Sequence, residues 1–364
     1  MTKLREFIKK YIPTYSVICF VILVICTLLH IISGISPSAA DFLNIRVGQS
    51  VRLILAKITS LLPFSLAELL LYLLLPGAVL LVIAFVRASH ERGRTLRLLA
   101  VVLATVSLLY SSFVLTLGLS FGTPTLDEKL GFSEKDVSAD ELRDTLTVIR
   151  DNINECAGEI EYRDGEAQTP HTNSELSEII CSAYRTAAEA YPAINTFDSR
   201  FKPVLSGEIM TACGTLGIYS YFTGESNLNM TYPDFSLPFT VAHEFAHQRG
   251  FARENEANFV AFLVCIGSED AFVRYSGYMT MYQYVSSALS RADSDAYTEV
   301  ASGLSAAARD DLRAYYARAR KYDGTVIDKV SSAMNDTYLK INGTVGVRSY
   351  GLVVDLAVAY YRDT

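Results

Sequence analysis

Three long apolar runs dominate the first third of the chain. They occupy residues 15–35, 66–86 and 98–121, and the first of them carries no formal charge. About 20 consecutive apolar residues are enough for a helix to cross a bilayer. Buried core helices are the alternative, but three such runs in succession are not typical of a globular core. The sequence therefore predicts three transmembrane helices.

The composition predicts a globular part in addition to this membrane part. The chain has 364 residues and is 50% hydrophobic, which lies between typical soluble and all-membrane proteins. We therefore expect a three-span transmembrane region over 1–121 and a separate domain over 122–364. The net charge of −7 argues against a nucleic-acid partner, which would require a basic face.

Positive charges in the short connecting segments predict the orientation. They lie at Lys3, Arg5, Lys9, Lys10, Arg87, Arg92, Arg94 and Arg97. Short cytoplasmic segments carry an excess of Lys and Arg. We therefore expect a multi-pass cell-membrane protein with a cytoplasmic N-terminus and an extracytoplasmic 122–364 domain. Cleavage of the first run as a signal peptide near 36–41 is an alternative that leaves this location unchanged.

The segment between the first two runs predicts an interfacial helix near 41–62. Its apolar residues recur at helical spacing, at Leu43, Val47, Val51, Ile54, Ile58 and Leu61. Arg46, Arg52 and Lys57 lie off this stripe. The pattern suits a helix in the membrane interface, and a helix packed on the outer domain is the alternative.

The 122–364 part has the pattern of a mostly helical α+β domain. Helical periodicity covers 138–160 and 174–191, glycines and short alternation within 211–230 favour strands, and helices return from 237. Its cysteines are Cys156, Cys181, Cys213 and Cys265. No pair has metal-site spacing, and both disulfides and buried free thiols stay open.

One short stretch, "SLPFTVAHEFAHQRG" (236–250), carries the chemistry. His243 and His247 are four residues apart, which puts both imidazoles on one face of a helix that would end at Gly250. Both imidazoles can then bind one zinc ion. Glu244 lies beside the first ligand, where it can take a proton from a water at the metal as that water attacks a carbonyl.

A catalytic zinc ion needs a third protein ligand. A second helix over 252–267 offers Glu254 or Glu256, which lie on different faces. Asn258 shares the face of Glu254, and its amide would hydrogen-bond a zinc-binding histidine. We therefore favour Glu254 as the third ligand and keep Glu256 as the alternative.

An HExxH motif followed by a helix with Glu-x-x-Ala-Asn resembles the gluzincin metallopeptidases. The resemblance implies that Glu254 is the third zinc ligand and that Asn258 supports the first histidine. Two features depart from it. Only six residues separate His247 from Glu254, and the tight turn is closer to the metzincin layout, whose third histidine is replaced here by Arg253.

A longer resemblance covers most of the chain. The string "FTGESNLN…SLPFTVAHEFAHQRGFARENEANF", with "RYSGY" (274–278) and "NDTYLKINGTVGVRSYG" (335–351), resembles an uncharacterised bacterial family of three-span membrane proteins. That family carries a predicted zincin domain. The resemblance implies an α+β zincin-like fold and a metal site, and it leaves the substrate open.

Substrate-side residues are expected on the strand before the metal helix. Residues 221–230 would form an edge strand that pairs with an extended peptide, with Asn227 and Asn229 bonding substrate amides. A turn carrying two surface asparagines is the equal alternative. Tyr350, after a glycine-rich turn, is the candidate donor to the oxyanion of the reaction.

Together these patterns predict a membrane-anchored zinc metallopeptidase with one catalytic Zn²⁺. It would hydrolyse peptides or proteins near the membrane surface. Two alternatives are a zinc amidase acting on cell-wall peptides and a non-catalytic zinc-stabilised membrane scaffold or sensor. The presence of Glu244 disfavours the scaffold, because a structural zinc site needs no general base. The natural substrate and the oligomeric state stay open.

Overall fold

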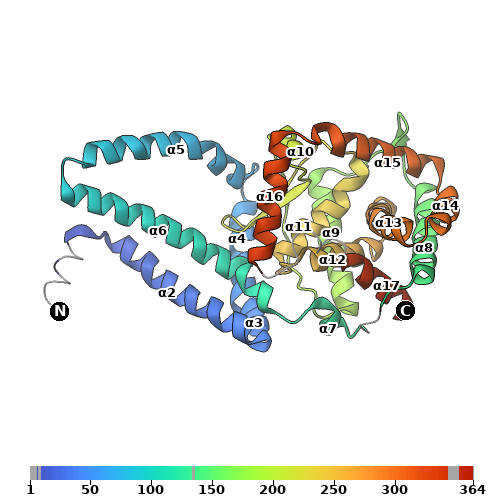
Figure 1. Ribbon diagram of the computed structural model, residues 1–364, viewed down its shortest axis with the longest axis horizontal. Helices are drawn as coiled ribbons and strands as arrows, with labels where there is room; N and C mark the ends of the chain where they lie inside the picture. Colours follow the sequence, from blue (N-terminus) through green and yellow to red (C-terminus); the bar gives the residue numbers. More distant parts are fainter. Residues whose placement is uncertain (1–5, 7–9, 133–135, 343–351, 364) are drawn as a thin grey trace.

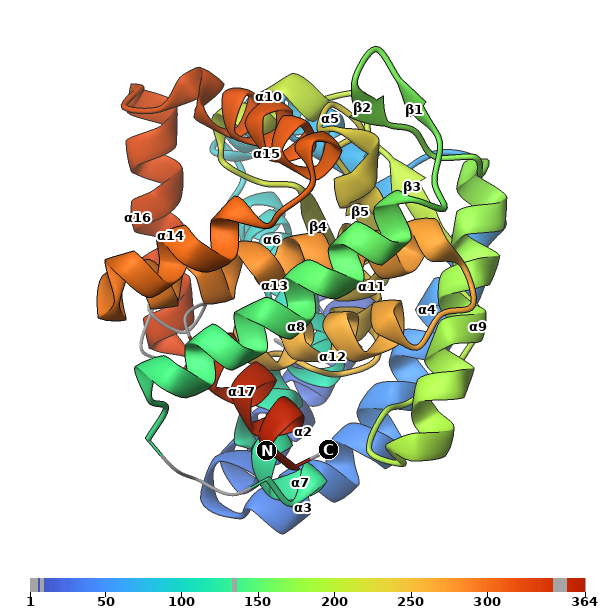
Figure 2. The ribbon, with the colours of Figure 1, turned by 90° about the vertical axis from the view of Figure 1, so that its right-hand side faces the viewer.

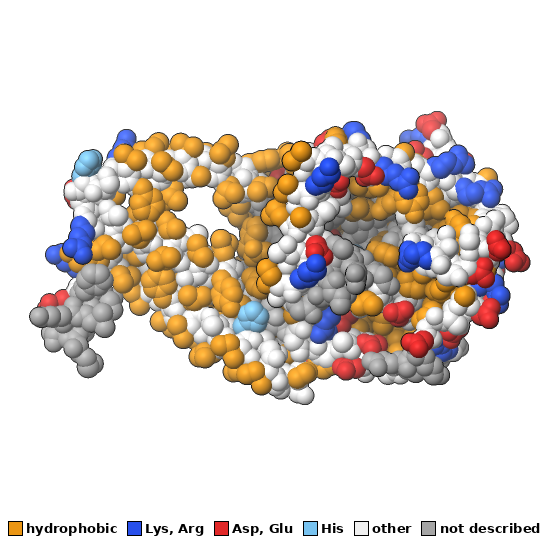
Figure 3. Space-filling model, in the orientation of Figure 1, with side chains coloured by type: hydrophobic (Ala, Val, Ile, Leu, Met, Phe, Trp, Pro, Cys, Tyr) orange, Lys and Arg blue, Asp and Glu red, His pale blue; other side chains and the backbone are white. Residues whose placement is uncertain are grey.

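The computed structural model describes residues 6, 10–132, 136–342 and 352–363. Three long helices project from one side of a globular helical part, so the molecule is elongated (Figure 1). These helices are α2 (Thr14–Ile35), α5 (Leu66–Ala88) and α6 (Arg92–Thr116). Each is long and apolar enough to cross a membrane, which confirms the three predicted helices and indicates membrane association. Hydrophobic side chains cover the projecting part (Figure 3).

The segment between α2 and α5 folds against the globular part. It forms α3 (Pro37–Leu43), a π-helical turn η1 (Asn44–Gly48) and α4 (Gln49–Ser60). The helix predicted near 41–62 is therefore present. Its α4 portion packs against α6 and β5 (Glu225–Leu228). This packing agrees with the alternative prediction, a helix packed on the globular part. Ile54 and Ile58 stay exposed.

Eleven further helices and three short 3-10 turns make up the rest of the helical structure in the described residues. The helices that come before the metal motif are α7 (Leu126–Leu130), α8 (Ala139–Ala157), α9 (Asn173–Ala190) and α10 (Gly207–Ala212). Those that contain or follow it are α11 (Leu237–Gln248), α12 (Glu254–Ile266), α13 (Ala271–Ala292), α14 (Ser294–Ser302), α15 (Ala306–Ala319), α16 (Val326–Ile341) and α17 (Val353–Asp363). The 3-10 turns lie at η2 (Gly118–Gly122), η3 (Asp234–Ser236) and η4 (Arg320–Tyr322).

Two small sheets complete the described fold. The strands β1 (Tyr162–Arg163) and β2 (Glu166–Ala167) form an antiparallel hairpin. The second sheet has the order β3 (Phe201–Pro203), β5, β4 (Gly217–Ser220), with β3 parallel and β4 antiparallel to β5. The described chain is thus mostly helical with few strands, as the sequence predicts.

The core of the globular part surrounds α11, α12 and α13. Helix α13 lies along α8, and α11 packs on α12 and on the three-stranded sheet (Figure 2). Phe245, Phe259 and Phe262 are fully buried among these helices. The helix that carries the metal motif is therefore embedded in the buried core of the globular part, which restricts the motif's side chains.

Two carboxylates join the globular part to the start of α5. Glu225 on β5 accepts hydrogen bonds from the backbone N–H groups of Leu66 and Ala67, at 3.0 and 2.8 Å. In the opposite direction, Glu68 accepts from the backbone N–H groups of Leu205 and Ser206, at 3.0 and 2.7 Å. A carboxylate at a helix N-terminus satisfies free N–H groups and complements the helix dipole. The sheet and α5 therefore hold each other in place.

The cysteines of the globular part are free thiols. Cys156, Cys181 and Cys265 are buried, and Cys213 is partly buried. Of the two possibilities that the sequence leaves open, the structure therefore has unpaired thiols.

Candidate metal centre

The turn between α11 and α12 brings the candidate ligands together. Helix α11 ends where Gly250 adopts a φ of +100°, a left-handed conformation that favours glycine. The N–H groups of Gly250 and Phe251 bond back to His247 and Ala246, at 3.0 and 3.1 Å. The chain reverses within a few residues, and α12 begins at Glu254. This tight reversal explains how Glu254, separated from His247 by only six residues, can still lie next to the histidines as a third ligand.

Three ligand atoms converge at the mouth of this turn. The Nε2 atoms of His243 and His247 are 3.0 Å apart. The Glu254 carboxylate oxygens lie 3.3 Å from His243 Nε2 and 3.6 Å from His247 Nε2. The cluster is partly accessible, since the His243 and Glu254 side chains are 14% and 15% exposed. Within the described residues this is the group of His, Cys, Asp and Glu side chains suited to a metal ion.

The geometry fits a zinc ion. Two ligands about 2.0–2.1 Å from a tetrahedral zinc lie about 3.3 Å from each other, close to the separations observed here. The Nδ1 atom of His247 lies 2.7 Å from the Phe251 carbonyl oxygen. Because a carbonyl only accepts, Nδ1 carries the proton and Nε2 keeps its lone pair for a metal.

The electrostatics of the cluster favour positive charge. Burial lowers the pKa of His247, but the Glu254 carboxylate outweighs it and raises that pKa to about 9. Burial raises the pKa of Glu254, and the charges on His247 and His243 outweigh it and hold the pKa below its usual range. A proton on the histidines and a metal cation would both be stabilised by the same carboxylate.

Glu244 lies beside the cluster but is not part of it. Its side chain is buried, and its Oε2 atom has no hydrogen-bond partner among the described residues. Burial raises its pKa, although the charges on His243 and His247 oppose this effect. A Cβ atom added at Gly217 on β4 would lie 2.6 Å from Glu244 Oε1. The carboxylate is therefore pressed against the sheet, next to the ligands.

The structure separates the two alternative third ligands. Glu256 is buried away from the histidines, where its Oε1 atom accepts from Arg253 Nη1 at 2.7 Å and from the Leu126 N–H at 3.1 Å. It anchors the start of α7 and is not placed to bind the metal. Among the two glutamates, only Glu254 reaches both histidines.

The expected support from Asn258 is not formed. Asn258 is buried on α12, but its Nδ2 atom and His243 Nδ1 both lack a hydrogen-bond partner among the described residues. Its side chain lies near Tyr284 on α13, and its effect is to lower the pKa of that tyrosine. The histidine support comes from the Phe251 carbonyl, because the tight turn brings that backbone group back toward α11.

The prediction that 221–230 forms an edge strand is wrong. The strand β5 within it is the buried centre of the sheet. The Asn227 amide bonds Ser65 Oγ and the Ile218 carbonyl, so it does not face a cleft. Asn229 bonds Thr211 and the Thr215 carbonyl. These amides hold loops and the start of α5, and β3 and β4 form the two edges of the sheet.

Two tyrosines near the ligands have no signal in the sequence. Tyr338 on α16 and Tyr284 both interact electrostatically with Glu254. Burial raises the pKa of Tyr284 to about 12, and burial also raises that of Tyr338, so both keep their hydroxyl protons. The chain has 22 tyrosines, and spacing does not single out these two. The sequence candidate Tyr350 lies outside the described residues.

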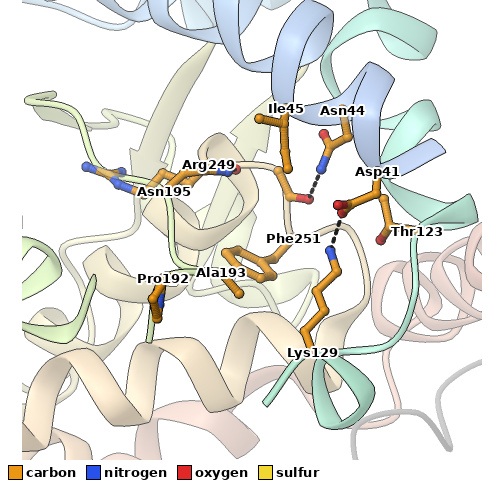
Figure 4. Close-up of a pocket in the computed structure, with 11 residues that line it drawn as sticks. Asp41, Asn44, Ile45, Thr123, Lys129, Pro192, Ala193, Asn195, Arg249 and Phe251 are labelled. Carbon is orange, nitrogen blue, oxygen red and sulfur yellow. Dashed lines mark hydrogen bonds and ion pairs between the residues drawn. The ribbon is translucent and has the colours of Figure 1, made fainter. Parts of the chain in front are cut away.

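The membrane-side segment supports the turn from behind. Asn44 Nδ2 donates to the Gly250 carbonyl at 3.3 Å, and Lys129 pairs with Asp41 at 2.6 Å (Figure 4). These residues border a cavity of about 210 Å³. Its lining includes Phe251 but none of the three ligand candidates. The cavity therefore lies on the far side of the turn from the metal cluster.

Comparison with known proteins identifies the family. A family described as "Protein of unknown function (DUF3810)" matches residues 47–358. The chain belongs to the DUF3810 family. The DUF3810 match includes α5, α6 and all three ligand candidates, and its description assigns no activity. No curated protein and no solved structure shows significant similarity to the chain.

Proposed function

We propose that this DUF3810 protein is a membrane-anchored zinc metallopeptidase with a zincin-like site. The observation that carries the proposal is the convergence of His243, His247 and Glu254 at separations that suit one tetrahedral zinc ion. Three protein ligands leave a fourth position open, as in catalytic zinc sites. A bound cation would also compensate for the partial desolvation of the Glu254 carboxylate in this cluster.

Each side chain has a distinct role in the proposed hydrolysis. A bound zinc ion would act as a Lewis acid on the scissile peptide carbonyl. Glu244 would accept the proton of the attacking water and deliver it to the leaving amine. Its Oε2 atom is free for this role, because no described residue bonds it. Tyr338 would donate a hydrogen bond to the oxyanion, since it lies near Glu254 and keeps its proton.

The free edge of β4 favours a peptide substrate. β4 is at the edge of its sheet, and Gly217 on it contacts Glu244. Ile218 is 55% exposed, so its surroundings are open. An extended peptide can add to such an edge through backbone hydrogen bonds. This arrangement supports peptides or protein segments near the membrane surface as substrates, on the extracytoplasmic side that the charge pattern predicts.

Two other functions use the same ligands. A cell-wall amidase would share the metal and Glu244 and differ only in the substrate. A non-catalytic zinc scaffold would not need Glu244 beside the metal. A buried carboxylate with an unpartnered oxygen costs stability. The presence of Glu244 at this position therefore favours catalysis over a scaffold.

Metal analysis of the full-length protein in detergent tests the proposal. The full chain is required because Asn44 and Glu225 join the membrane side to the globular side. We expect about one zinc ion per chain in the wild type and loss of zinc in His243→Ala. His171→Ala is the matched control, since His171 pairs with Asp270 outside the cluster. A wild-type protein without zinc affinity would refute the proposal, and zinc without cleavage of any peptide would favour the scaffold.

A further inference from the structure

Helix α16 turns its apolar face away from the protein. Side chains at a helical repeat on one face are exposed, namely Val326 (78%), Ile327 (53%), Val330 (52%), Met334 (68%) and Ile341 (78%). The opposite face contacts the fold, because Leu339 is fully buried and Ser331 Oγ bonds the Cys213 carbonyl. A surface helix of a globular protein normally has the reverse arrangement. We call this exposed row the α16 stripe.

The α16 stripe lies at the level where the spanning helices enter the globular part. At one end, Ser331 of α16 bonds the carbonyl of Cys213, the residue that follows α10. Ser206, the residue that precedes α10, bonds Glu68 in the first turn of α5. Tyr338 interacts with Tyr221, whose carbonyl accepts from Ser112 near the end of α6. Helix α16 therefore runs from the start of α5 toward the end of α6.

The orientation of α16 suits a helix lying in the plane of a membrane. It runs across the direction of α2, α5 and α6, at the edge of the globular part that is nearest to them (Figure 1). Seen along the spanning helices, it lies to one side of them (Figure 2). Hydrophobic side chains line the edge of this helix that faces the spanning region, and charged side chains lie on its other side (Figure 3).

Other exposed apolar side chains extend the α16 stripe at the same level. Leu205 is 91% exposed although its backbone bonds Glu68 at the start of α5. Phe222 is 37% exposed and follows Tyr221, which packs against Phe113 of α6. These residues continue the apolar surface of the spanning helices onto the globular part.

We infer that the α16 stripe, with Leu205 and Phe222, is a lipid-contact surface that seats the globular part on the bilayer crossed by α2, α5 and α6. The bilayer is the occupant because this surface is continuous with the lipid-facing helices of the same chain. An apolar helix face buries about 5–10 Å into the headgroup boundary of a bilayer. Since Asn44, between α2 and α5, donates to the Gly250 carbonyl, the seating holds the turn that carries the metal cluster next to the membrane. This inference does not depend on zinc or on hydrolysis.

Single tryptophan substitutions test the inference cleanly, because the chain contains no tryptophan. Full-length Met334→Trp and Leu205→Trp proteins are placed in nanodiscs of phosphatidylcholine with or without bromine on the acyl chains near the headgroup. Ser332→Trp is the matched control, since Ser332 is exposed on the other side of α16. Leu73→Trp, exposed within α5, gives the emission of a residue in contact with lipid.

Brominated lipid should quench Met334→Trp and Leu205→Trp at least about twofold, as it does Leu73→Trp, and should leave Ser332→Trp nearly unchanged. Acrylamide, a quencher in water, should give the opposite order. Equal quenching of Met334→Trp and Ser332→Trp by both agents would overturn the inference. Protection of Met334→Trp from acrylamide without quenching by brominated lipid would overturn it in favour of a second copy of the chain.

Discussion

The guanidinium group of Arg52 lies directly against the backbone of Gly250, at the turn between the two ligand-bearing helices. Arg52 is fully buried and donates to the carbonyl oxygens of Thr116, the last residue of α6, and Asn44, at 3.0 and 3.2 Å. A Cβ atom added at Gly250 would collide with this guanidinium group. A residue from the membrane side of the chain therefore closes the space behind the metal cluster.

Replacement of Gly250 by alanine should weaken metal binding. The side chain would be strained at a φ of +100° and would displace Arg52, so the turn that aligns His247 with Glu254 must move. A non-glycine residue in the left-handed region costs about 1–2 kcal/mol before any collision. We expect a fall of about 10-fold or more in zinc affinity, measured by competition with a chelator.

Gly214→Ala is the matched control for this experiment. Gly214 has a φ of +68° but open space around its Cβ position. Gly214→Ala therefore introduces the same kind of backbone strain as Gly250→Ala but no collision with a neighbouring side chain. Equal zinc affinities and melting temperatures for the two variants would show that the contact with Arg52 does not position the turn.

Local patterns predicted the parts of this molecule that depend on local interactions. The three apolar runs, the HExxH helix and its end at Gly250 follow from length, spacing and turn chemistry. The placement of Glu254 opposite the histidines also follows, because a helix fixes which residues share a face. These elements need little information from the rest of the chain.

The remaining features depend on contacts between distant segments. Arg52 is buried because carbonyl oxygens of η1 and α6 accept its hydrogen bonds. From the sequence alone, an arginine is expected on the surface. The central position of β5 reflects pairing with β3, which the sequence did not reveal. Tyr338 is more than 80 residues after Glu254 in the sequence, yet the two interact electrostatically. No local periodicity encodes such relationships.

The two neighbouring glutamates of α12 should behave differently on substitution. Glu254→Gln should lose most of the bound zinc, because a neutral amide is a poor ligand and the charge that favours a cation disappears. Glu256→Gln should retain zinc, since Glu256 bonds Arg253 and Leu126. Zinc content by mass spectrometry of the full-length variants decides between them. Loss of zinc in Glu256→Gln with retention in Glu254→Gln would contradict the observed arrangement.

The carboxylate of Glu225 should stabilise the junction with α5. Glu225→Ala removes both acceptors for the Leu66 and Ala67 N–H groups, which are partly buried. The loss should destabilise the full-length protein by about 1–3 kcal/mol, seen as a lower melting temperature in detergent. Glu189→Ala, an exposed position on α9, should change it little. Equal melting temperatures would show that this cap does not hold α5.

Glu244→Gln separates catalysis from metal binding. Gln is nearly isosteric with Glu and can still hydrogen-bond, so zinc content and fold should be retained. It cannot accept the proton of the attacking water, so peptide hydrolysis should fall by about 10²–10⁴-fold. The measurement is cleavage of a peptide library by equal amounts of zinc-loaded wild type and variant. Wild-type cleavage by the zinc-loaded variant would exclude Glu244 as the general base.

Gly217→Ala should reduce turnover through Glu244 without removing the metal. An added Cβ atom would lie 2.6 Å from Glu244 Oε1 and 2.7 Å from its Cγ, so the carboxylate must move away from β4. Displacement of a catalytic group by about 1 Å can cost about 10²-fold in rate. Because the three atoms nearest to the added Cβ atom all belong to Glu244, zinc content should match the wild type. Ile218→Ala, at the exposed neighbouring position, controls for a general effect on the strand. If Gly217→Ala keeps both zinc and full activity while Glu244→Gln is inactive, contact with β4 does not set the position of the carboxylate.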